Sequence, residues 1–318
     1  MRVLTKVFVL IIAGLFFLLS FNPLVIAETE GEHEEFNDNI IYVNKDGTAD
    51  YTTIKEAVQN ADDGDTIFVY SGTYIEDIIV INKTITLIGE DKHSTIIKNS
   101  TSWWTLVIKN CNVTIKEFTL MSKKINNNEC YGPIRCFSSN VIISDNIIRN
   151  SMVGILIHSY SKHDYVIIKN NTFINNYVAI NTYKHSNIEN NIFKGNFACL
   201  QIISGGNRVI KNNIFEYNII GITFRNNKND NFSFNDFMFN GRNFALLQYS
   251  DAINQSFYQN YYGRSRTLPY PIRVWDWKKI GEWGSPRGPH GDIGFYYPTF
   301  IFENNTAQEP NNKKLCSN

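Results

Sequence analysis

The sequence is poor in the residues that interrupt strands or cross-link a chain. Its 318 residues include 8 prolines and 5 cysteines, with no CxxC pair. Methionine is also scarce, with 4 residues. An odd number of cysteines without paired spacing does not favour a disulfide framework, even in an exported chain. Cys130 and Cys136 could close a small loop, and Cys199 is expected to be a buried thiol.

The chain has no net charge and none of the common catalytic or nucleotide-binding motifs. The 30 basic and 30 acidic side chains cancel, which excludes a strong electrostatic attraction to nucleic acid or acidic lipid. The sequence contains no GxSxG, P-loop or HExxH motif, so it lacks the common signatures of hydrolases, nucleotide-binding proteins and zinc proteases.

A long apolar stretch occurs only near the N-terminus. A basic start precedes an almost wholly apolar run at residues 7–19, and a small-residue cleavage site stands at residues 25–27. This layout predicts a signal peptide at residues 1–27, followed by a polar linker at residues 28–40. An uncleaved anchor is the alternative, but the run is short for a spanning helix, which needs about 20 residues. The mature chain is expected to be secreted, extracellular or on the cell surface (periplasmic if the host has a periplasm), with no membrane span.

The middle of the chain repeats itself every 20–25 residues. Six asparagines form one column, with Ile or Phe three positions before and Ile, Phe or Tyr two positions after each. The asparagine column consists of Asn146, Asn171, Asn191, Asn213, Asn235 and Asn260. A column of small residues stands eight positions after the first four of these asparagines: Gly154, Ala179, Cys199 and Gly221. These columns predict stacked coils of short strands, because one coil alone cannot bury its apolar face.

Such a stack is an all-β, single-stranded parallel β-helix, or solenoid, expected over residues 41–262. Like residues then lie one above another at about 4.8 Å, so the asparagines are expected to form a buried ladder of side-chain amides. Residues 53–61 (TIKEAVQNA) have the pattern of a short amphipathic helix that would cover the first end of the stack. The Trp-, Pro- and Gly-rich segment 263–302 is expected to form an irregular C-terminal cap, and the polar segment 303–318 a disordered tail.

Residues 51–90 (YTTIKEAVQNADDGDTIFVYSGTYIEDIIVINKTITLIGE) resemble the opening of secreted right-handed β-helix proteins. The NN-[IF]-x-x-N-x-x-G-I coils and the sequence NYYGRSRTLPYPI at residues 260–272 are similar to the pectin-lyase-like superfamily, and more closely to its NosD-type surface and periplasmic group. The resemblance spans about residues 41–272 and implies a right-handed parallel β-helix. It implies no single activity, because the group mixes lyases, hydrolases, epimerases and binding proteins.

The NosD type is named for a copper-accessory protein, but copper ligands are sparse in this sequence. The 6 histidines are dispersed, with no HxH pair and no methionine cluster. His158, His163 and His185 lie on consecutive predicted coils and could approach one another. Most single surface histidines bind nothing, so no cofactor is expected and no metal can be named.

In β-helix enzymes of this superfamily, the sugar chain typically lies along the outside of one parallel sheet. In this chain the corresponding outward positions lie ten and twelve residues after each ladder asparagine. They carry no Asp or Glu, which does not favour a carboxylate-pair glycosidase or a calcium site. The side chains on this face that we expect to bind a ligand are Arg135, His158, Asn181, Tyr183, Gln201 and Arg225, beside Phe137.

We therefore expect an exported protein, a monomer, that binds a carbohydrate or another surface polymer along this face without catalysis. Its two arginines favour an acidic polysaccharide such as a uronate polymer. One alternative is a polysaccharide lyase or epimerase, with Tyr183 or His158 as base and Arg225 neutralising a uronate carboxylate. The other is a purely structural surface or adhesion module whose polar face binds no ligand.

Overall fold

The computed structural model describes residues 39–99, 102–122, 131–137, 140–158, 164–183, 185–225, 227–246, 252–253, 255–263, 270–278, 295–303 and 311. The predicted signal peptide and almost all of the predicted linker lie outside these residues, as does most of the predicted C-terminal tail.

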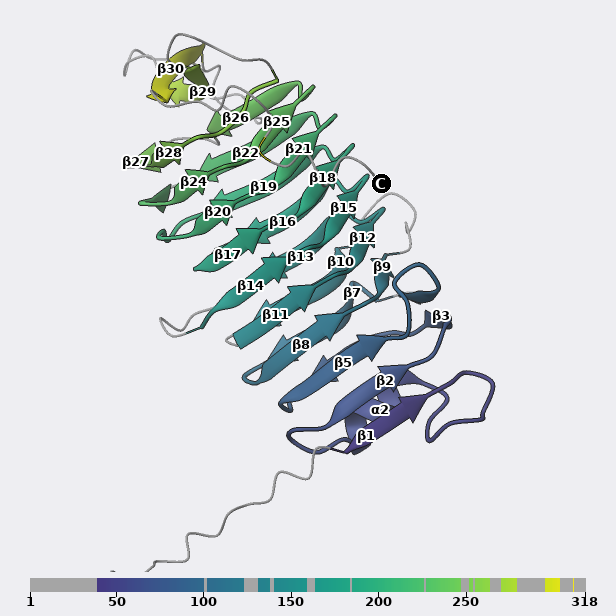
Figure 1. The fold of residues 1–318 in the computed structure, drawn as a ribbon. Coiled ribbons are helices and arrows are strands. Elements are labelled where there is room, and N and C mark those ends of the chain that lie inside the picture. Colours follow the sequence, from purple (N-terminus) through teal and green to yellow (C-terminus); the bar gives the residue numbers. More distant parts are fainter. Residues whose placement is uncertain are drawn as a thin grey trace, which may run out of the picture. The chain divides into compact units, whose positions relative to one another are not determined.

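Three parallel sheets form the body of the described chain (Figure 1). Strands that are neighbours in a sheet come from consecutive coils, so every link between them passes once around the stack. Sheet A contains β1 (Ile40–Val43), β2 (Thr66–Val69), β5 (Ile85–Gly89), β8 (Asn112–Lys116), β11 (Asn140–Ser144), β14 (Val166–Lys169), β17 (Ser186–Glu189), β20 (Val209–Lys211), β24 (Asn231–Ser233) and β28 (Ser256–Tyr258). Sheet B contains β3 (Gly72–Ile75), β6 (Thr95–Lys98), β9 (Thr119–Met121), β12 (Ile147–Arg149), β15 (Thr172–Ile174), β18 (Ile192–Lys194), β21 (Ile214–Glu216) and β25 (Asp236–Met238). Sheet C contains β4 (Ile79–Ile81), β7 (Trp104–Lys109), β10 (Gly132–Phe137), β13 (Val153–Ile157), β16 (Val178–Thr182), β19 (Ala198–Ile203), β22 (Ile220–Arg225) and β26 (Arg242–Leu246).

Two smaller pairs complete the strands. β23 (Asn227–Lys228) and β27 (Ala252–Ile253) are parallel, whereas β29 (Tyr270–Lys278) and β30 (Phe295–Glu303) form an antiparallel pair within the C-terminal segment. The three parallel sheets confirm the predicted all-β parallel solenoid. No helix in the described ranges is long and apolar enough to cross a membrane.

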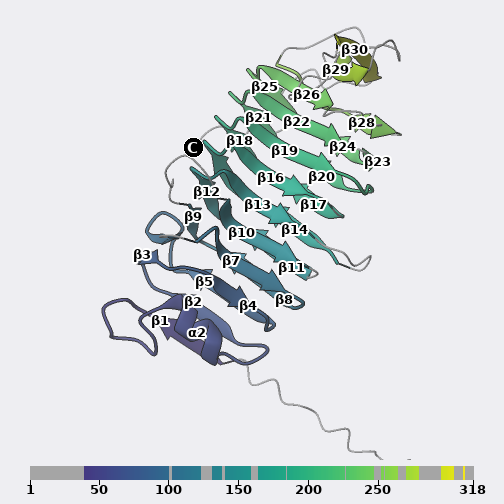
Figure 2. The same ribbon diagram turned by 180° about the vertical axis from the view of Figure 1, so that it is seen from behind.

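The predicted capping helix is present as α2 (Ile54–Asn60), which packs against β1, β2 and β4 at the N-terminal end of the stack (Figure 2). Ile54, Ala57 and Val58 are buried, as the amphipathic pattern requires. The Thr53 hydroxyl caps the helix by accepting from the Glu56 backbone N–H at 3.2 Å. The Glu76 carboxylate accepts from the first two helical N–H groups at 2.7 and 2.8 Å, so α2 is tied to the neighbouring coil.

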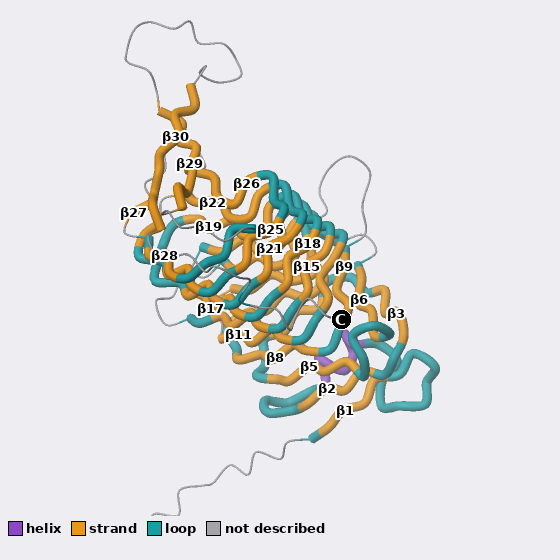
Figure 3. The backbone as a smooth tube through the Cα atoms, turned by 45° about the horizontal axis from the view of Figure 1, so that its top comes forward, coloured by secondary structure: helices purple, strands orange, loops and turns teal. Residues whose placement is uncertain are grey.

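In most strands of the three sheets alternate side chains are buried, and the buried positions repeat from coil to coil. The turns of successive coils lie one behind another (Figure 3). In sheet B the buried rings of Phe173, Phe193, Phe215 and Phe237 stack with centroids 4.9, 4.8 and 4.7 Å apart. These distances match the strand spacing, so the parallel register itself brings like rings into contact.

The asparagine column forms the predicted ladder at the turns between sheets A and B, and its six members are at most 1% exposed. The backbone N–H and the side-chain amide of Asn171 both donate to Asn191 Oδ1, at 2.9 and 3.1 Å. The same amide also donates to the backbone carbonyl of Ile143 at 2.8 Å. The residues before three ladder positions, Asn170, Asn190 and Asn212, have φ of 58°, 57° and 55°, a conformation that asparagine tolerates well.

A second ladder follows at the turns between sheets B and C. Asn176, Asn196, Asn218 and Asn240 recur five residues after four of the first-ladder asparagines. Asn196 donates through its backbone and its side chain to Asn218 Oδ1, at 2.8 and 3.1 Å. Each of these coils is thus held at two of its three corners.

Candidate ligand-binding surface

The outer face of sheet C carries the side chains predicted to bind a ligand. We call Arg135, Phe137, His158, Asn181, Tyr183, Gln201 and Arg225 the sheet C strip. In the described structure Arg225 is exposed and the other six are partly exposed. One row follows the register from Arg135 through Leu156 to Asn181 and Gln201. A second row, two residues further along each strand, contains Phe137, His158 and Tyr183.

Aromatic rings hold the first part of the strip together. The Arg135 guanidinium carbon lies 4.2 Å from the centroid of the Phe137 ring and 5.6 Å from that of Trp104. Phe137 stacks on His158 at 6.2 Å, and His158 on Tyr183 at 4.9 Å. These contacts fix the position of the guanidinium by cation–π attraction.

The strip keeps hydrogen-bonding capacity that the described residues do not use. No described residue accepts a hydrogen bond from the Arg135 guanidinium, and Arg135 Nε is buried without a partner among them. The Asn181 amide donates to Gln201 Oε1 at 3.0 Å, while Asn181 Oδ1 is buried and accepts nothing. Unsatisfied polar groups of this kind are uncommon in folded proteins, and a polar ligand or water on the strip would supply their missing partners.

The outward positions of sheet C beyond Gln201 are not all exposed. Thr223 and Ala245 also fall on outward positions but are only 3% and 6% exposed. The Thr223 hydroxyl donates a hydrogen bond to the Leu200 carbonyl at 3.3 Å. Arg225 is exposed but separated from Tyr183 by Ile203, its register partner, so it lies at the far end of the strip.

An exposed apolar row beside the strip was not predicted. It follows the second asparagine ladder and places large side chains at the turns from sheet B into sheet C: Trp103, Tyr131, Met152, Tyr177, Phe197 and Ile219. The rings of Tyr177 and Phe197 stack at 4.5 Å with an interplanar angle of 7°. Their faces therefore cover each other and chiefly their edges meet solvent. The apolar residue directly after Asn176, Asn196 and Asn218 was the signal for this row in the sequence.

The thiols of the described part of the chain lie inside the stack. Cys111, Cys136 and Cys199 are buried, so the buried thiol predicted at Cys199 is confirmed. Cys130, which could have closed a small loop with Cys136, lies outside the described residues. Burial raises the pKa of all three thiols, that of Cys136 to about 12. They are therefore protonated at neutral pH and poor nucleophiles or metal ligands.

Comparison with known proteins identifies the family of this chain. Residues 58–266 match the model of the family described as periplasmic copper-binding protein (NosD). The chain belongs to the NosD family. No curated protein matches the sequence.

Several solved structures share the β-helix at low sequence identity. Pectin methylesterase from carrot is 13% identical, with a TM-score of 0.45 over 70% of this chain and 82% of that one. The PL6 family alginate lyase AlyGC is 13% identical, with a TM-score of 0.45 over 71% of this chain and 40% of that one. A PL6 alginate lyase in complex with a trisaccharide is 14% identical, with a TM-score of 0.45 over 73% of this chain and 61% of that one. Similarity this distant leaves the activity of the chain open.

The family description names copper, but the described residues do not fit a copper site. They contain no group of three or more His, Cys, Asp or Glu side chains that could hold a metal ion. His158 stacks between Phe137 and Tyr183, and the three thiols are buried. His33, His163 and His290 lie outside the described residues.

Proposed function

We propose that this NosD-family β-helix protein is exported and binds an acidic carbohydrate polymer along the sheet C strip without cleaving it. The position of the Arg135 guanidinium carries this proposal. The guanidinium lies over the rings of Phe137 and Trp104 and has no hydrogen-bond acceptor among the described residues. A fixed cation that lacks a counter-ion among the described residues is suited to a carboxylate, which accepts strong charge-assisted hydrogen bonds from guanidinium.

The composition of the strip supports an acidic polymer as the ligand. The Gln201 amide supplies donors for sugar hydroxyls, and the Tyr183 hydroxyl can both donate and accept. Arg225 adds a second positive charge at the far end, and the strip carries no carboxylate of its own. Five consecutive strands, from β10 to β22, span about 19 Å at the sheet spacing. Several sugar units can therefore be contacted at once.

Two further observations support binding by an exported protein over hydrolysis. The strip lacks the pair of carboxyl groups that glycosidases place across the scissile bond. Export is supported by the description of the family as periplasmic and by the apolar N-terminal segment of the sequence.

The test is to titrate the purified protein with oligogalacturonate and alginate oligomers, and with neutral oligosaccharides of the same length. Replacing Arg135 and Arg225 together with Ala is expected to weaken binding of the acidic oligomers by about tenfold or more. The matched control is Arg149→Ala, which removes a half-buried arginine from sheet B and is expected to leave binding unchanged. Unchanged affinity in the double variant would refute the proposal.

A polysaccharide lyase or epimerase is the second candidate, favoured by the stacking of Tyr183 on His158. Such an enzyme would use one of these two side chains as base beside a neutralised uronate carboxylate. Release of unsaturated uronate, or a change in uronate epimer ratio, that is lost in Tyr183→Phe would favour this reading. A purely structural module would bind none of the acidic oligomers.

A further inference from the structure

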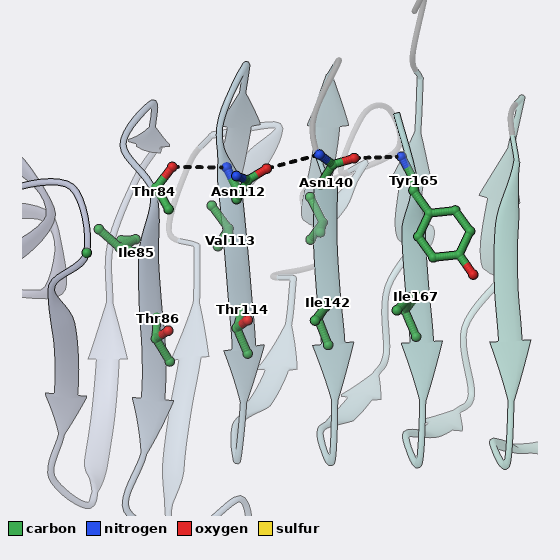
Figure 4. A pocket seen from close by; sticks show the side chains of 12 residues that line it. Thr84, Ile85, Thr86, Asn112, Val113, Thr114, Asn140, Ile142, Tyr165 and Ile167 are labelled. Atoms are coloured by element: carbon green, nitrogen blue, oxygen red, sulfur yellow. Dashed lines mark hydrogen bonds between the residues drawn. The ribbon is translucent and has the colours of Figure 1, made fainter. Parts of the chain in front are cut away.

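The outer face of sheet A carries a pocket of about 280 Å³, whose lining residues are shown in Figure 4. No residue of the sheet C strip lines it. Two rows of side chains from β5, β8, β11 and β14 and the turns before them line it. Thr84, Asn112, Asn140 and Tyr165 form its edge row, and Thr86, Thr114, Ile142 and Ile167 form its floor row. We call these eight residues the sheet A groove.

The edge row is a chain of hydrogen bonds along the axis of the stack. The Asn112 backbone N–H donates to the Thr84 hydroxyl at 3.4 Å, and the Asn140 side-chain amide donates to Asn112 Oδ1 at 3.1 Å. The Tyr165 backbone N–H then donates to Asn140 Oδ1 at 3.1 Å. Both amides are therefore fixed in orientation, although Asn112 and Asn140 are exposed.

This row keeps donors that the described residues leave unused. The Asn112 side-chain amide and the hydroxyls of Thr86 and Thr114 make no hydrogen bond to a described residue. The Asn140 amide uses one acceptor and has a second hydrogen to donate. These groups point from neighbouring strands into one groove, at intervals of about 4.8 Å.

The remainder of the groove is apolar, and its lining carries no charge. Ile142 and Ile167 are half-buried in the floor row, and Tyr165 is 40% exposed at the end of the edge row. None of the 12 lining residues is ionisable apart from the Tyr165 phenol. Lys116 and Lys169 lie two residues beyond the floor row, outside the lining.

We propose that the sheet A groove binds an uncharged oligosaccharide whose chain runs along the axis of the stack. The amide and threonine donors hydrogen-bond to sugar hydroxyls, Ile142 and Ile167 contact the apolar face of a sugar ring, and Tyr165 stacks on the sugar at its end. The four strands span about 14 Å, which limits the contacted ligand to a short run of sugar units. This site is independent of the acidic ligand assigned to the sheet C strip.

The experiment begins with neutral hexasaccharides of glucose, mannose and N-acetylglucosamine, tested one by one by titration against the purified protein. At least one is expected to bind. The double variant Thr86→Val with Thr114→Val, which keeps shape and removes two hydroxyls, is expected to weaken that binding by about tenfold. Tyr165→Ala is expected to weaken it by at least as much, because the stacking surface is lost.

Matched controls separate this site from other surfaces. Tyr258→Ala removes a tyrosine that is 47% exposed on the same sheet but outside the groove, and it is expected to leave binding unchanged. The paired replacement of Arg135 and Arg225 is also expected to leave neutral binding unchanged. Loss of acidic binding alone in that variant keeps the two sites distinct.

A measurement on the unaltered protein covers the case in which a variant fails to fold. The side-chain amide resonances of Asn112 and Asn140 are expected to shift when the neutral oligosaccharide is added, whereas those of the buried Asn196 are not. Three results overturn the proposal: no neutral hexasaccharide binds, the shifts map elsewhere, or acidic oligomers bind in the groove more tightly than neutral ones.

Discussion

Two rows of asparagines run along the same stack with nearly the same coil-to-coil geometry and opposite exposure. In the buried ladder, the Asn171 amide donates to Asn191 Oδ1 at 3.1 Å. In the sheet A groove, the Asn140 amide donates to Asn112 Oδ1, also at 3.1 Å. The ladder residues are almost completely buried, whereas both groove asparagines are exposed.

The difference lies in what else each amide contacts. The Asn191 amide donates to the carbonyls of Ile168 and Glu189 at 2.8 and 3.0 Å, in addition to Asn213. The Asn140 amide donates only to Asn112 among the described residues. The same repeated residue therefore uses all its capacity for stability when it faces the core, and keeps capacity for a ligand when it faces solvent.

The largest expected effect belongs to the first ladder. Asn191→Leu removes three side-chain donor contacts and leaves the backbone N–H and amide of Asn171 without their acceptor. Each stranded buried polar group costs about 1–3 kcal/mol, so we expect a loss of at least about 3 kcal/mol in the free energy of unfolding. Denaturant unfolding followed by circular dichroism measures this loss. A change below about 1 kcal/mol would contradict the assignment of the ladder to stability.

The second ladder is expected to contribute somewhat less. The Asn196 amide donates to the Phe173 carbonyl at 3.0 Å and to Asn218 at 3.1 Å, one contact fewer than Asn191 makes. Asn196→Leu should therefore cost about 1 kcal/mol less than Asn191→Leu. The two variants are compared in the same denaturant series, and the reverse order would show that the turns between sheets B and C hold the coils more firmly.

Much of the interior could be predicted from the sequence, because the interior repeats. The column from Asn146 to Asn260 indicated both the coil length and the ladder, since an inward position meets the same neighbours in every coil. The helix at Ile54–Asn60 followed from its buried face of Ile54, Ala57 and Val58. Alternation also placed the sheet C strip at outward positions, and its binding role stays a prediction.

The exterior was less predictable, because it depends on local packing that does not repeat. Alternation assigned Thr223 to the outer face, yet it is buried with its hydroxyl bonded to the Leu200 carbonyl. The sheet A groove depends on the relative heights of side chains from four strands, such as Thr114 beside Ile142. No column of one residue type marks such a hollow in the sequence.

The smallest expected effect on stability tests the exposed row. Asn140→Leu removes the bond to Asn112 Oδ1 and the acceptor of the Tyr165 N–H. Because both partners lie at the surface, water replaces these bonds, and the free energy of unfolding should change by no more than about 0.5 kcal/mol. The affinity for a neutral oligosaccharide should nevertheless fall by about fivefold or more, since one hydrogen-bonding group and the orientation of Asn112 are lost. Asn231→Leu, at an exposed asparagine of sheet A outside the groove, is the matched control and should change neither quantity. A stability loss comparable to that of Asn191→Leu would place Asn140 with the buried ladder and remove the distinction between the two rows.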